Sequence, residues 1–147
     1  MEFITCNDSN NNIEFLIDLI KGMQEGYHNS YWVISDLDLI PLFHGDYKGD
    51  GGVNFKEIAY SFNKRVEKEK VVILNYNELM SILNDAQTVR RAVLVCFSSD
   101  FSIDTDSFRP LVEPKNPNIL SNDNAKYELR ILDGGLFIIL KNNTIEN

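Results

Sequence analysis

Apolar residues recur at helical spacing near the start of the chain. Between residues 13 and 20, isoleucine and leucine stand three and four positions apart, which places them on one face of a helix. Asn10 or Asn11 can cap the start of this helix, and Gly22 can end it. The pattern therefore predicts a first amphipathic helix that packs closely against the rest of the domain.

Two further stretches show the same periodicity. Asn54 precedes the second one and Glu57 stands three positions on, which is the arrangement of a capping box. Asn77 can cap a third helix, whose apolar positions lie at residues 79–83. Three helices are therefore expected.

β-branched and aromatic runs predict the strands. Residues 31–34 and 37–42 indicate two strands around a tight turn, and Pro41 makes the second an edge strand or a strand end. Residues 71–74 form a continuous apolar run, which is typical of a strand buried on both faces. Residues 92–97 form another all-apolar strand.

The C-terminal part combines an irregular stretch with a hairpin. Three of the four prolines fall within residues 98–124, which lack clear periodicity. Residues 127–132 and 136–140 flank the turn Asp133-Gly134-Gly135 and form a hairpin. Alternation is imperfect in the second hairpin strand, which indicates that it lies inside the sheet.

These elements predict an α+β fold with a mixed or largely antiparallel sheet and about three helices packed on one side. The chain has 147 residues, of which 44% are hydrophobic and 24% charged, as in an ordinary globular protein. One domain over residues 1–147 is therefore expected. Two cysteines do not make a disulfide framework, and Cys96, inside an apolar run, is interpreted as a buried small hydrophobe.

The net charge of −8 argues against nucleic-acid binding, because neutralising phosphates requires clustered lysine and arginine. No apolar stretch reaches the length of a membrane span, and the N-terminus does not resemble a signal peptide. We therefore expect a cytoplasmic protein that binds neither nucleic acid nor membrane.

The acidic excess gathers in predicted loops. Seven aspartates form two groups, one facing only Lys48 and the other uncompensated until Arg109. They are Asp36, Asp38, Asp46, Asp50, Asp100, Asp104 and Asp106. Such groups favour a basic protein partner, although acidic residues that serve solubility alone are the alternative.

Two aromatic residues, Phe101 and Phe108, stand within the second acidic group. Buried rings supply affinity at protein interfaces while charge steers the approach. We therefore include both rings in the predicted partner-binding surface. Folding back onto the domain's own core is the alternative for each.

Residues 46–57 match several positions of a calcium-binding EF-hand loop. Asp46 and Asp50 stand at the first and fifth positions, and Glu57 at the twelfth. However, Lys48 occupies the third position, where an oxygen ligand is needed, and no entering helix is predicted before the loop. We expect a glycine turn rather than a calcium site, and no bound metal or cofactor.

Residues with catalytic potential are few. The chain has no nucleophile elbow, phosphate loop or dinucleotide fingerprint, so we predict no catalytic residues. A small hydrolase or metal-dependent enzyme that uses His44, Asp46 and Asp50 remains the alternative, and a ligand-sensing or assembly domain is a further one.

A strand Tyr31-Trp32-Val33-Ile34-Ser35-Asp36 near the start and a closing hairpin around Asp133-Gly134-Gly135, in a small acidic domain, resemble the immunity proteins that accompany secreted bacterial polymorphic toxins, including the LXG-type toxins of Gram-positive bacteria. The resemblance covers the whole chain in length and layout. It implies a protein that binds the C-terminal domain of a cognate toxin, often a basic nuclease, and blocks its active site or holds it inactive.

Overall fold

The computed structural model describes residues 1–25, 29–42 and 57–143. The strands are β1 (Glu2–Thr5), β2 (Ser30–Pro41), β3 (Val72–Asn75), β4 (Ala86–Ser98), β5 (Tyr127–Leu132) and β6 (Leu136–Lys141), and the helices are α1 (Ile13–Glu25), α2 (Glu57–Glu69) and α3 (Tyr76–Leu83). All described strand pairs are antiparallel, and they form one sheet in the order β1-β6-β5-β4-β2-β3. The predicted α+β fold is confirmed.

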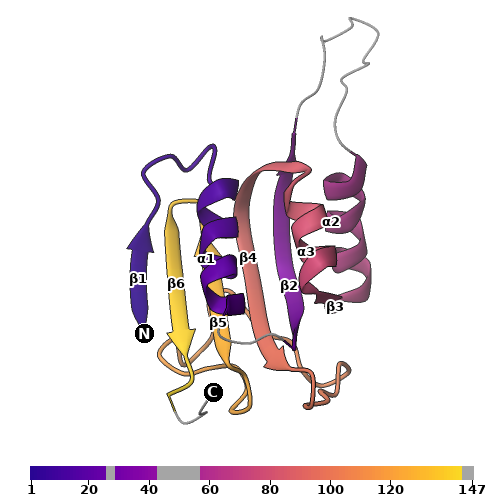
Figure 1. The fold of residues 1–147 in the computed structure, drawn as a ribbon, viewed down its shortest axis with the longest axis vertical. Helices are drawn as coiled ribbons and strands as arrows, with labels where there is room; N and C mark the ends of the chain where they lie inside the picture. The colour runs from indigo at the N-terminus through magenta and orange to yellow at the C-terminus, as the bar shows by residue number, and fades with distance from the viewer. Residues whose placement is uncertain (26–28, 43–56, 144–147) are drawn as a thin grey trace, which may run out of the picture.

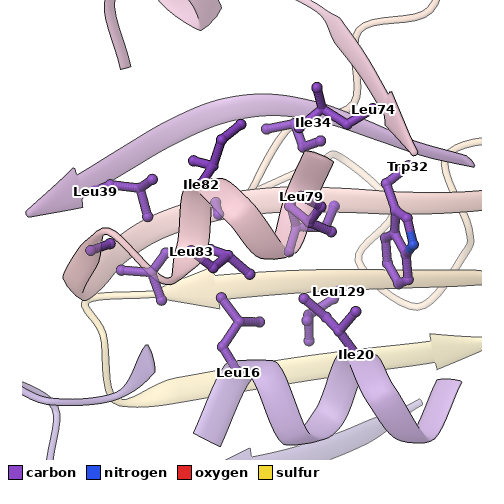
Figure 2. Packing of buried hydrophobic residues seen from close by; sticks show 14 of the residues in the cluster. Leu16, Ile20, Trp32, Ile34, Leu39, Leu74, Leu79, Ile82, Leu83 and Leu129 are labelled. Atoms are coloured by element: carbon purple, nitrogen blue, oxygen red, sulfur yellow. The ribbon is translucent and has the colours of Figure 1, made fainter. Parts of the chain in front are cut away.

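The three helices lie on one face of this sheet. Figure 1 shows α1 running along the strand direction over the middle of the sheet, between β6 and β4, while α2 and α3 lie side by side over β2 and β3. Figure 2 shows how Leu16 of α1 and Leu79 of α3 meet Trp32 of β2 and Leu129 of β5 in the main core. All four side chains are buried, so apolar residues of α1 and α3 help to close this side of the sheet.

The opposite face of the sheet is closed by irregular chain. We call residues 99–126, which connect β4 to β5, the cover segment. In β4, Val93, Val95 and Phe97 point away from the helices and form a second buried cluster. Phe108 and Ala125 of the cover segment complete that cluster. An all-apolar strand requires cover on both faces, and here irregular chain provides the second one.

Buried polar groups fasten the cover segment to the sheet. Glu128 and Arg130 of β5 form an ion pair at 2.7 Å, and their side chains are 0% and 1% exposed. Arg130 also donates to the carbonyl oxygens of Pro117 at 2.6 Å and Ile119 at 2.9 Å. The Glu128 carboxylate accepts from the backbone N–H and the hydroxyl of Ser121. Each charge therefore has several partners, as a buried ion pair requires.

Helix α1 begins at Ile13, directly after Asn12. The predicted stop at Gly22 is wrong, because the helix continues to Glu25. Met23 extends the apolar face and is buried against the core, while a Cβ at Gly22 would meet no neighbouring atom. Packing of Met23 thus outweighs the modest helix cost of the glycine.

Helix α3 is capped by Asn75, the last residue of β3, rather than by the predicted Asn77. The Asn75 side chain accepts from the Glu78 N–H at 2.8 Å, and the Glu78 carboxylate accepts from the Asn75 N–H at 3.0 Å. This capping box lets the chain pass from strand to helix without a linker.

Strand β3 is an edge strand, and its predicted burial on both faces is wrong. It pairs with β2 alone, and Ile73 on its outer face is 43% exposed.

Strand β4 begins at Ala86, six residues before the predicted start at Ala92. The prediction missed these residues because Arg90 and Arg91 interrupt the apolar pattern of the strand. Strand β1 was not predicted, and the predicted helix start at Asn54 lies outside the described residues.

The C-terminal hairpin was predicted correctly. β5 and β6 pair around Asp133 and Gly134, both of which have positive φ. β6 also pairs with β1, which confirms that it lies inside the sheet. Pro41 is the last residue of β2, which confirms the strand end that was one of the two alternatives predicted for this proline.

Strand β2 is one continuous strand, so the predicted pair of strands around a tight turn is wrong. Ser35 pairs with Val93 and Asp38 with Arg91, so Asp36 and Leu37 together stand opposite Ala92. This is a β-bulge. Ile34, Leu37 and Leu39 all face the helices, whereas unbroken alternation would have turned the two aspartates inward.

Asn12 provides a first test of the fold. Its buried side chain donates to the carbonyl oxygens of Val89 at 2.7 Å and Gly134 at 2.8 Å, and accepts from the Val89 N–H at 2.8 Å. Asn12→Ala leaves these buried groups without partners, so we expect a loss of about 2–4 kcal/mol in the free energy of unfolding. Urea denaturation measures it. The exposed Asn11→Ala is the matched control, and equal effects of the two variants would contradict the assignment.

Candidate functional site

The bulge in β2 brings two aspartates to two arginines of β4. Arg91 Nε lies 2.8 Å from Asp36 Oδ1, and Arg90 Nε lies 3.8 Å from Asp38 Oδ2. In β4, Arg90 is itself an extra residue, because Arg91 pairs with Asp38 and Val89 with Leu39. The extra residue in β2 and the extra residue in β4 lie close together on these paired strands, and together they turn both acidic and both basic side chains outward. The sequence interpretation, which left the two aspartates facing only Lys48, did not foresee these pairs.

A pocket of about 560 Å³ lies beside the bulge, and we call it the bulge pocket. Its walls come from β2, from the end of α2, from Arg91 of β4 and from the cover segment. Its charged lining residues are Asp36, Asp38, Glu67, Lys70, Arg91 and Arg109. Three carboxylates and three cations therefore share a pocket whose formal charges balance, within a protein of net charge −8.

Two residues that line the bulge pocket have left-handed backbone conformations. Asp36 has a φ of 49° and Lys70 a φ of 71°, and the one other non-glycine residue with positive φ in the described ranges is Asp133 in the hairpin turn. At Lys70, the N–H donates to the Val66 carbonyl at 2.7 Å and closes the end of α2. Such conformations persist where the surrounding structure holds them, and they cluster at functional sites.

Side-chain bonds to the backbone hold the pocket walls together. Asn63 of α2 accepts from the Leu39 N–H at 2.9 Å and donates to the Leu39 carbonyl at 2.7 Å, as a neighbouring strand would. On the far face, the Ser35 hydroxyl donates to the Pro110 carbonyl at 2.7 Å. Helix, strand and cover segment are therefore tied to each other on either side of the bulge.

The predicted aspartates of the cover segment form a separate acidic surface. Asp100, Asp104 and Asp106 are exposed, and they are not among the residues that line the bulge pocket. The Asp104 carboxylate accepts from the Asp106 N–H at 3.0 Å. In the described part of the chain, none of the three carboxylates is in an ion pair with Lys, Arg or His.

The two phenylalanines of the predicted surface contact the second core. Both stand against Phe97, with ring centroids 5.3 Å away for Phe101 and 5.7 Å for Phe108. Phe108 is 9% exposed and belongs to the core, as the alternative expectation had it. Phe101 is half-buried, and its carbonyl accepts from the Tyr31 hydroxyl at 2.6 Å. Phe101 therefore packs against the second core while remaining partly exposed beside Asp100.

The remaining candidate residues, His44, Asp46 and Asp50, lie outside the described residues, as does most of the EF-hand-like loop. Both the calcium argument and the hydrolase alternative therefore stay predictions. Within residues 1–25, 29–42 and 57–143, no group of three or more His, Cys, Asp or Glu side chains could hold a metal ion.

Cys96 carries little reactivity of the kind that catalysis uses. Cys96 is buried, as predicted, and both cysteines are free thiols. Burial raises the pKa of the Cys96 thiol to about 11, so the nucleophilic thiolate is scarce at neutral pH. Burial also raises the pKa of the Tyr31 hydroxyl, which keeps it protonated as a donor to Phe101.

No helix in the described part of the chain is long and apolar enough to span a membrane. Comparison of the chain with protein-family models, with curated proteins and with solved structures finds no match.

Residues missed at the sequence level make up much of the bulge pocket. Arg91, Arg109, Lys70 and Glu67 were not predicted to share a site with Asp36. One signal was available: the apolar alternation of β2 changes phase between Ile34 and Leu37, which is what an inserted residue produces.

Substitutions at Asp36 test the bulge. A β-branched residue tolerates positive φ poorly, so Asp36→Val should lower the free energy of unfolding by about 1–3 kcal/mol. Asp36→Asn removes the same surface ion pair but accepts the left-handed conformation, so it should cost less than about 1 kcal/mol. Urea denaturation of both variants is the measurement, and an equal loss would show that the backbone conformation at residue 36 is not what matters.

Proposed function

We propose that this protein is a non-enzymatic inhibitor that binds a basic protein domain through the acidic surface of its cover segment. The observation that carries the proposal is the set of three exposed carboxylates, Asp100, Asp104 and Asp106, without an ion pair in the described chain. Carboxylates that are already exposed and unpaired can meet a cationic partner without first breaking an internal pair.

The two acidic groups predicted from the sequence carry different weight in this proposal. Asp36 and Asp38 each have an arginine partner in β4, so their charge is partly neutralised within the protein. Among residues 1–25, 29–42 and 57–143, no Lys, Arg or His forms an ion pair with Asp100 or Asp106 of the cover segment. We therefore centre the interface on the cover segment, with Phe101 as an apolar contact, and leave Asp36 and Asp38 at its margin.

The overall charge supports the same type of partner. A net charge of −8 attracts a cationic domain over roughly a Debye length, about 8 Å at physiological salt. In the immunity-protein interpretation, the partner is the C-terminal domain of a bacterial toxin, such as a basic nuclease. The inhibitor would then act in the cytoplasm of the bacterium that makes both proteins.

Charge reversal with a matched control tests this proposal. Asp100→Lys with Asp106→Lys changes two exposed carboxylates and spares Asp104, whose side chain holds the loop backbone. Binding would be measured by surface-captured kinetics against the C-terminal domain encoded by the adjacent upstream reading frame. We expect the association rate to fall about tenfold at low salt and the difference to shrink at high salt.

The control carries the same charge change on the opposite face. Glu14→Lys with Asp18→Lys alters two exposed residues of α1, which lies on the helix-covered side of the sheet. This pair should slow association much less. Equal slowing by the two pairs would assign the effect to net charge and contradict a specific acidic surface, and no binding by the wild-type protein would contradict the immunity assignment.

A further inference from the structure

The charged groups of the bulge pocket divide into those with partners and those without. Arg91 is bound by Asp36, and Asp38 lies within 3.8 Å of Arg90. Glu67, Lys70 and Arg109 also line the pocket, are exposed, and take part in no ion pair within the described chain. One carboxylate and two cations are thus available to a ligand.

The same pocket has an apolar part. Leu37, Val66, Pro110 and Leu111 line it beside the charged groups, and Leu111 is 57% exposed. Small-ligand pockets combine such apolar lining with a few convergent polar groups, and they commonly measure about 300–1,000 Å³. The volume of about 560 Å³ falls within that range.

We propose that the bulge pocket binds a small zwitterion of the α-amino acid class with an apolar side chain. The carboxylate of the ligand meets Arg109, whose guanidinium can bind it through two parallel hydrogen bonds, and Lys70. Its ammonium meets Glu67, and its side chain contacts the apolar part of the pocket. This site goes beyond the proposed inhibitor function and does not depend on it.

A ligand with a single charge would pair either with the two basic groups or with Glu67, but not with both. An anion would neutralise Lys70 and Arg109 but would stand near Glu67, while a cation would meet Glu67 but stand near the two basic groups. Charges left without a partner in a partly desolvated site reduce affinity. Because the groups available to a ligand carry charges of both signs, a ligand that also carries both charges is favoured.

The backbone supports a preformed site at this place. Asp36 and Lys70, the two left-handed residues of the pocket, lie on β2 and at the end of α2 respectively. Bonds from Asn63 and Ser35 tie α2 and the cover segment to β2. A site whose walls are fixed before binding loses less conformational entropy when the ligand enters.

Calorimetric titration with three related compounds tests the ligand class. L-Leucine carries both charges, N-acetyl-L-leucine lacks the ammonium, and 3-methylbutylamine lacks the carboxylate. We expect L-leucine to bind, and each singly charged compound to bind at least about tenfold more weakly. Absence of leucine binding, or equal binding of either singly charged compound, would overturn the proposal.

Lys70 offers a variant that separates binding from folding. Lys70→Gly removes the ammonium group and accepts the φ of 71° without strain, so its melting temperature should be equal or higher. L-Leucine affinity should fall about tenfold or more. Lys68→Gln, on the exposed side of α2 outside the pocket, should leave affinity unchanged. Full affinity in Lys70→Gly would overturn the site.

These titrations contain no protein partner, so a failure to bind L-leucine would not count against the proposed inhibitor function.

Discussion

A sheet with two apolar faces and helices on one of them must find cover for the other, and the remaining architecture follows from that constraint. Here irregular chain supplies the cover, and the buried pair Glu128–Arg130 holds it in place. Arg130 bonds to two carbonyl oxygens of the cover segment and Glu128 to Ser121. A buried ion pair is weak evidence for stability in itself, but breaking one is costly, because the remaining charge loses its partner. The pair therefore makes sheet and cover segment depend on each other.

The same segment shapes both candidate binding surfaces. One end of it presents Asp100 and Asp106 to solvent, and further along it passes under the β2 bulge, where Ser35 binds the Pro110 carbonyl. Arg109 thereby becomes part of the bulge pocket. Irregular chain carries function in many proteins because its side chains are freed from strand or helix periodicity. In this protein it also completes the core, so the surfaces that it carries are anchored by buried side chains of the same segment.

The sequence predicted what local patterns determine, namely the fold class, the closing hairpin, the interior place of β6 and the burial of Cys96. It failed where distant segments decide the outcome. Asp36 and Arg91 lie far apart in the chain, so their ion pair depends on the register of β2 against β4. The covering role of this segment could not be predicted either, because residues 98–124 have no periodicity to show which side chains turn inward. Phe108 therefore stood out as a candidate partner anchor, whereas its ring is buried against Phe97.

The most direct test of this account is hydrogen exchange in the variant Arg130→Met, which removes the donor to both cover-segment carbonyls and leaves Glu128 without its cation. If the pair holds the cover segment on the sheet, backbone amides of residues 108–126 should exchange about 10²-fold faster or more, while amides of α3 on the opposite face change much less. A parallel variant, Glu128→Leu with Arg130→Leu, removes both charges and should still release the carbonyls of Pro117 and Ile119. Unchanged exchange in the cover segment, or the same acceleration in α3 and in the cover segment, would contradict the account.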